Sequence, residues 1–80
     1  MTRSLQRFAV FAFESTHAAL DAEDALKSAS VLVVPIPTPG SLGGLCGLAM
    51  RVPLDQADLA RDVLTNRGME PRAESVIDDF

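Results

Sequence analysis

The most reactive side chain in the sequence is that of Cys46, the only cysteine among the 80 residues. It lies in a glycine-rich stretch, PGSLGGLCGLAM, at residues 39–50. A thiol is a nucleophile only as the thiolate, and its pKa of about 8.5 falls next to a helix N-terminus or a cation. Gly43, Gly44 and Gly47 allow backbone N–H groups to converge on an anion at this point. The stretch therefore fits a sulfur nucleophile presented by a loop.

Cys46 also has a second interpretation. Free cysteine is among the most frequently buried residue types and usually packs as a small hydrophobe. Counting by twos along the sequence, Cys46 shares a strand face with Leu48, Met50 and Val52, which directs it into a core. The residues alone leave both interpretations open.

A second polar group, Ser15, Thr16 and His17, follows the apolar segment at 7–13. Ser15 or Thr16 is suited to cap a helix, because a hydroxyl oxygen accepts a hydrogen bond from an N–H group of the first turn. A lone histidine at a helix start is more often a solvated residue than a catalytic base. His17 is therefore a supporting residue in this interpretation, not a base.

Composition argues against several classes of partner. Seven basic residues against 11 acidic ones give a net charge of -4, whereas phosphate binding needs concentrated Lys and Arg. No apolar run approaches the ~20 residues that span a bilayer, and the first eight residues do not resemble a signal peptide. A single cysteine forms no internal disulfide, which fits a reducing compartment. We expect a cytoplasmic protein with no nucleic-acid or membrane partner.

Metal and nucleotide sites are not expected either. One histidine and one cysteine do not make a zinc ligand set. The segment GSLGG lacks both the Walker lysine and the strand–helix context of a dinucleotide fingerprint. The sequence therefore predicts no metal and no cofactor.

Hydrophobic periodicity predicts four strands and two helices. The strands are expected at residues 7–13, 30–36, 46–52 and 71–77. The first helix is expected at 17–29, and the second from an Asp55 N-cap to Arg67, with Gly68 as its stop. The second strand is expected to end at three prolines, Pro35, Pro37 and Pro39, followed by a loop to Gly44.

The order β-α-β-β-α-β in 80 residues predicts an α+β ferredoxin-like sandwich, a four-stranded antiparallel sheet with two helices on one face. Right-handed crossovers set the strand order as fourth, first, third, second. We expect one domain over residues 1–80, with an ordered core at about 7–77.

This topology brings separate segments to one edge of the sheet. The end of the first strand, the start of the first helix and the loop before the third strand meet there. Cys46 is then expected near Ser15, Thr16 and His17, where the helix N-terminus favours an anion. The end of the second helix reaches the same edge with Arg67, and Arg72 is expected nearby on the fourth strand.

The sequence resembles a known family in three segments: FAFESTHAALDAEDALK, VVPIPTPGSLGGLCGLAMRV and ADLARDVLTNRG. It is similar there to the selenium/sulfur (Se/S) carrier protein-like domains, a small bacterial family. The most specific parts are the Ser-Thr pair that opens the first helix and the proline-rich loop that leads into Cys-Gly. The Cys-Pro-x-Pro motif of other sulfur-relay carriers is absent from this sequence.

The resemblance implies a carrier that holds sulfur or selenium on Cys46 as a persulfide or perselenide, with Gly47 as its motif partner. The partners would be a cysteine desulfurase-like donor and an acceptor protein. No turnover of its own is required, so we do not expect an enzyme. The alternative is a non-catalytic ferredoxin-like module that binds a small ligand or forms a homodimer, with Cys46 as a structural residue.

Overall fold

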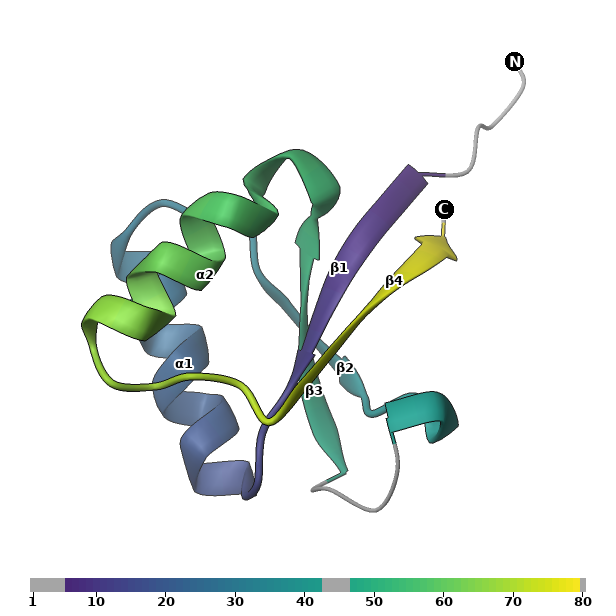
Figure 1. The fold of residues 1–80 in the computed structure, drawn as a ribbon, viewed down its shortest axis with the longest axis horizontal. Coiled ribbons are helices and arrows are strands. Elements are labelled where there is room, and N and C mark those ends of the chain that lie inside the picture. The colour runs from purple at the N-terminus through teal and green to yellow at the C-terminus, as the bar shows by residue number, and fades with distance from the viewer. Residues whose placement is uncertain (1–5, 43–46, 80) are drawn as a thin grey trace.

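The computed structural model describes residues 6–42 and 47–79. Four strands form one antiparallel sheet in the order β2-β3-β1-β4, and two helices cover one of its faces (Figure 1). The strands are β1 Gln6–Ala12, β2 Val34–Pro37, β3 Leu48–Pro53 and β4 Ala73–Asp79. The helices are α1 Thr16–Ser28 and α2 Ala57–Asn66, with short 3-10 turns η1 Gly40–Leu42 and η2 Leu54–Gln56. The predicted ferredoxin-like fold and strand order are confirmed.

The hydrophobic core lies between the sheet and the helices. Alternate residues of the first strand segment, Ala9, Phe11 and Phe13, face the helices and are at most 2% exposed. The helices contribute mainly small side chains, and the fully buried ones among them include Ala19, Ala22, Leu26, Ala60 and Leu64. Alanine at these positions lets the helix backbones lie close to the sheet, as the composition of α1 predicts.

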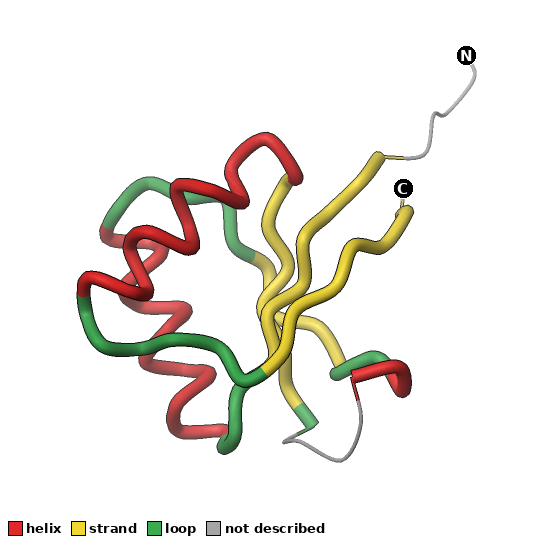
Figure 2. The backbone as a smooth tube through the Cα atoms, in the orientation of Figure 1, coloured by secondary structure: helices red, strands yellow, loops and turns green. Residues whose placement is uncertain are grey.

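The opposite face of the sheet is also partly covered. Phe8 is 6% exposed and Val10 is fully buried, although neither belongs to the helix-side core. The guanidinium carbon of Arg51 lies 4.1 Å from the centroid of the Phe8 ring, a cation–π contact. The turn η1 lies on this side of the sheet, near β4 (Figure 2).

The second strand differs from its prediction. It occupies Val34–Pro37 and not 30–36, because the Leu32 N–H donates a hydrogen bond to Gln56 Oε1 at 2.8 Å and not to β3. Pro35 and Pro37 lie within the strand, whereas the sequence predicts that they end it. β2 is an edge strand, so a residue without an N–H group is tolerated where that group would face solvent.

Register explains which positions tolerate proline. The Thr38 N–H donates to the Gly47 carbonyl oxygen at 3.1 Å, so the even-numbered positions of this segment direct their N–H groups at β3. Val34 and Ile36 pair with Arg51 and Ala49 in the same register. The prolines occupy the odd-numbered positions between them.

The other boundaries shift by one or two residues. β1 ends at Ala12, one residue before the expected end, and β4 begins at Ala73 and not at residue 71. β3 begins at Leu48, so Gly47 is a bend outside the strand. Residue 46, where this strand was expected to begin, lies outside the described residues.

Asp55 is not the N-cap of the second helix, contrary to the sequence prediction. It lies in η2, and α2 begins after Gln56, whose side chain makes no capping hydrogen bond. The 3-10 turn that follows Pro53 uses the residues that the pattern assigns to the cap and first turn of the helix. The predicted stop at Gly68 is confirmed, since this residue has a φ of 68° after the C-cap Arg67.

Candidate functional site

The start of α1 is fixed at the sheet edge where β1 ends. Ser15 is extended, with φ -147° and ψ 159°, and its Oγ accepts a hydrogen bond from the Ala18 N–H at 3.0 Å. The Ser15 carbonyl oxygen accepts the next helical bond, from the Ala19 N–H, at 3.0 Å. Ser15 and not Thr16 is therefore the N-cap, which settles the choice that the sequence leaves open.

Thr16 and His17 lie in the first turn of α1 and are exposed. His17 Nε2 lies 3.3 Å from Asp21 Oδ2, one helical turn further on, and the histidine side chain is 88% exposed. This pairing belongs to a solvated helix face. Within the described residues, His17 has no cysteine, serine or other nucleophile as a hydrogen-bond partner.

Gly47 marks the described end of the loop that precedes β3. It is exposed, and a Cβ atom built on it would meet no atom within 4 Å. Its φ is not in the left-handed region, so neither space nor backbone conformation requires glycine here. Cys46, Gly43 and Gly44, the other predicted site residues of this loop, lie outside the described residues.

Gly47 and the start of α1 belong to the same edge of the sheet. β1 and β3 are antiparallel neighbours, and their ladder ends with Ala12 opposite Ala49. Gly47 lies two residues before Ala49, and Glu14 lies two residues after Ala12. The polypeptide that leaves β1 for α1 and the polypeptide that enters β3 therefore meet at this edge, as the topology predicts.

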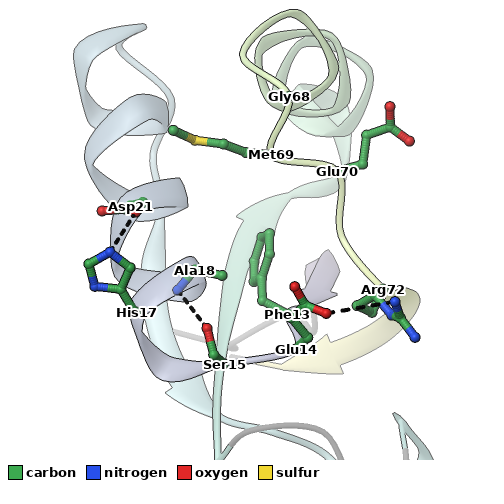
Figure 3. A pocket seen from close by; sticks show the side chains of 10 residues that line it. All are labelled: Phe13, Glu14, Ser15, His17, Ala18, Asp21, Gly68, Met69, Glu70 and Arg72. Atoms are coloured by element: carbon green, nitrogen blue, oxygen red, sulfur yellow. Dashed lines mark hydrogen bonds and ion pairs between the residues drawn. The ribbon is translucent and has the colours of Figure 1, made fainter.

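A cavity of about 560 Å³ lies at this edge, between α1 and the connection from α2 to β4 (Figure 3). The β1–α1 segment contributes Phe13, Glu14, Ser15, His17, Ala18 and Asp21. The α2–β4 connection contributes Gly68, Met69, Glu70 and Arg72. The sequence predicts Ser15 and His17 as site residues, but it does not predict the cavity.

Four side chains of the cavity form two pairs, and the carboxylate of Glu70 also lines the cavity. Besides the His17–Asp21 pair, Arg72 Nη1 lies 3.7 Å from Glu14 Oε2, and both of these side chains are more than 60% exposed. The Arg72 backbone N–H donates to the Ala12 carbonyl oxygen at 2.9 Å, which fixes the start of the β4 segment against the end of β1. In Figure 3, Phe13 lies between the two pairs and Met69 lies above it.

Two expectations about arginines change. Arg72 does reach this edge, but it precedes β4 and is not part of it. Arg67 is the exposed C-cap of α2 and does not line the cavity. Glu14, Met69 and Glu70 carry no motif, so only the packing of the two connections reveals them. The i,i+4 spacing of His17 and Asp21 is the one local signal that the sequence contains.

The described residues hold no group of three or more histidine, cysteine, aspartate or glutamate side chains that could bind a metal ion. No helix in the described ranges 6–42 and 47–79 is long and apolar enough to cross a membrane.

The fold and the sheet edge define a small α+β module whose candidate site lies at the start of α1. The family described as "Putative Se/S carrier protein-like" matches residues 8–74, and the chain belongs to this family. Neither the curated proteins nor the solved structures contain a significant match.

Proposed function

We propose that the chain is a carrier that holds sulfur or selenium on Cys46 and passes it to a partner protein. The observation that carries this proposal is the family match, which runs from residue 8 to residue 74 and so includes Cys46. Cys46 is the only thiol of the chain, so a carrier function that uses a thiol needs this residue.

The described neighbours of Cys46 support the same assignment. Gly47, the residue that follows Cys46 in the sequence, lies at the sheet edge where α1 begins. The first turn of α1 belongs to that edge and has backbone N–H groups without helical acceptors. The positive end of the helix dipole favours an anion, and both the thiolate and the persulfide are anions.

The proposed transfer consumes no external oxidant or reductant, because each step exchanges one sulfur–sulfur bond for another. The Cys46 thiolate attacks the outer sulfur of a persulfide on a cysteine desulfurase-like donor. The sulfur–sulfur bond of the donor breaks, its cysteine leaves as a thiolate, and a persulfide forms on Cys46. An acceptor thiolate then attacks the outer sulfur of that persulfide, and Cys46 leaves as a thiolate. With selenium, a perselenide takes the place of the persulfide.

Alkylation of the folded protein tests whether Cys46 can act as this nucleophile. The rate of reaction with iodoacetamide, followed across pH by mass spectrometry, reports the thiolate fraction. We expect a titration midpoint below the ordinary thiol pKa of about 8.5, because the edge favours the anion.

The same experiment separates the carrier from the alternative module with a structural cysteine. A midpoint at or above about 8.5, or reaction only in denaturant, indicates a buried or ordinary thiol and contradicts the carrier. Free cysteine as a model thiol, measured in the same buffers, is the control for the intrinsic reactivity of the reagent.

A further inference from the structure

The cavity between α1 and the α2–β4 connection combines apolar and charged walls. Phe13 is 2% exposed and belongs to the core, and Met69 and Ala18 pack against that core. The guanidinium of Arg72 and the carboxylate of Glu14 lie together on one side of this apolar surface (Figure 3). A pocket with an apolar floor and a few polar groups is the usual form of a small-molecule site.

The Arg72–Glu14 contact leaves both groups able to bind a ligand. Their separation of 3.7 Å exceeds the 2.7–2.9 Å of a charge-assisted hydrogen bond between nitrogen and oxygen. Exposed pairs of this kind contribute little to stability. Arginine also has five N–H donors in a planar fork, which suits a second carboxylate.

The spacing of the two charges matches one class of ligand. In an α-amino acid, a single carbon joins the ammonium and the carboxylate, so a nitrogen and an oxygen atom of opposite charge lie roughly 3 Å apart. In the cavity the protein supplies the two opposite charges, and Arg72 Nη1 lies at a similar distance, 3.7 Å, from Glu14 Oε2. Such a ligand can therefore place its carboxylate on Arg72 and its ammonium on Glu14 at the same time.

We propose that this cavity binds a small α-amino acid with an apolar side chain, in its zwitterionic form. The carboxylate contacts the Arg72 guanidinium, the ammonium contacts the Glu14 carboxylate, and the side chain lies on Met69 and Ala18. The contacts proposed here involve described residues only, so this proposal does not rest on the carrier function proposed for Cys46.

Titration of the ¹⁵N-labelled full chain with L-methionine tests the site. We expect saturable shifts of amide signals in residues 13–21 and 68–72. Two analogues test the contribution of each charged group to binding. The first, 3-(methylthio)propylamine, lacks the carboxylate, and the second, 4-(methylthio)butanoate, lacks the ammonium. Each analogue should bind at least about tenfold more weakly than L-methionine, because one charged contact is lost. Glycine, which lacks the side chain, should also bind more weakly.

Matched variants locate the binding. Arg72→Gln and Glu14→Gln should each weaken L-methionine binding by about tenfold or more. Arg67→Gln removes an exposed cation outside the cavity, and Asp62→Asn removes an exposed carboxylate outside it. Both should change the dissociation constant by less than about twofold.

Three results would overturn the proposal: no saturable shifts, equal binding of the analogues, or equal binding by Arg72→Gln protein that retains the wild-type amide dispersion. The titration is repeated with Cys46→Ser, which should bind L-methionine like the wild type. A failure of the amino-acid site is thus distinguished from a failure of the carrier, whose test depends on the thiol.

Discussion

Ser15 determines where α1 begins. Its side chain satisfies the Ala18 N–H and its backbone carbonyl accepts the first helical bond, so the helix starts at the edge that holds the candidate site. The neighbouring hydroxyl residue, Thr16, lies inside the helix and is exposed. Two adjacent residues of similar chemistry therefore have different structural roles.

Replacing the cap should destabilise the protein measurably. For Ser15→Ala we expect a loss of about 1 kcal/mol in the free energy of unfolding, measured by urea denaturation, because one N–H group of the first turn loses its acceptor. Thr16→Ala is the matched control and should change this free energy by less than about 0.5 kcal/mol. Equal losses for the two variants would contradict the assignment of the cap.

At the residue scale, local patterns predict some roles and not others. Hydroxyl residues just before a helical pattern predict a cap at Ser15 or Thr16, and a glycine just after one predicts the stop at Gly68. Asp55 satisfies the same rule but lies in a 3-10 turn, because the residues after Pro53 adopt η2 before α2 begins. Sequence pattern alone does not distinguish these two kinds of first turn.

The two helices end in the same way. In α1 the Val31 N–H donates to the Leu26 carbonyl at 3.0 Å, and in α2 the Met69 N–H donates to the Leu64 carbonyl at 2.8 Å. Both are Schellman motifs, in which the residue after the C-cap adopts a positive φ. In α2 that residue is Gly68, whereas in α1 it is Ser30, with a φ of 64°. The sequence gives no comparable signal for the end of α1.

This difference predicts opposite effects at the two helix ends. Ser30→Gly should raise the free energy of unfolding by about 0.5–1 kcal/mol, because glycine adopts a positive φ without the steric cost of a Cβ atom. Gly68→Ala should lower it by about 1 kcal/mol, from backbone strain alone, since nothing lies within 4 Å of the added Cβ. Thermal and urea denaturation measure both changes, and the same sign for the two variants would contradict this account.

Arg61 joins α2 to the edge strand β4. Its Nε and Nη2 atoms donate to the two carboxylate oxygens of Glu74 at 3.2 and 2.7 Å, and its Nη1 donates to Asp58 at 2.7 Å. The hydrogen bond to Glu74 is the main cause that raises the pKa of Arg61, so the guanidinium stays charged. The sequence does not predict this contact, because Arg61 and Glu74 are 13 positions apart and come together only when α2 packs beside β4.

A double-mutant cycle measures the strength of this connection. Arg61→Ala, Glu74→Ala and the double variant should give a coupling energy of about 0.5–1 kcal/mol, since the geometry is bidentate but both side chains are more than a third exposed. The exposed pair Arg7–Asp78, at 3.5 Å, is the control and should give a smaller coupling. A coupling near zero for Arg61 and Glu74 would show that this contact does not hold α2 on β4.

For the whole molecule, the sequence predicts the fold better than the site. The alternation of strand and helix patterns, together with right-handed crossovers, is sufficient to place β1 between β3 and β4 and to bring Gly47 to the edge where α1 begins. The cavity depends on how the β1–α1 and α2–β4 connections pack. Glu14 and Arg72 are 58 positions apart in the chain, and no pattern in the sequence links them.

The proposed carrier, whose net charge is -4, also has to bind its partner proteins as a whole molecule. A carrier thiol transfers sulfur or selenium only if another protein supplies the atom and a third group accepts it. The proposed carrier function therefore requires an encounter between proteins, and it depends on the thiol of Cys46.

The most direct test of the carrier is the mass of the intact protein after incubation with a cysteine desulfurase and L-cysteine, under non-reducing conditions. We predict an added mass of about 32 Da, the mass of one sulfur atom, on wild-type protein and none on Cys46→Ser. The adduct should disappear on treatment with dithiothreitol. With a selenium donor the added mass should be about 80 Da. Wild-type protein that stays unmodified while the desulfurase itself carries a persulfide would contradict the carrier function.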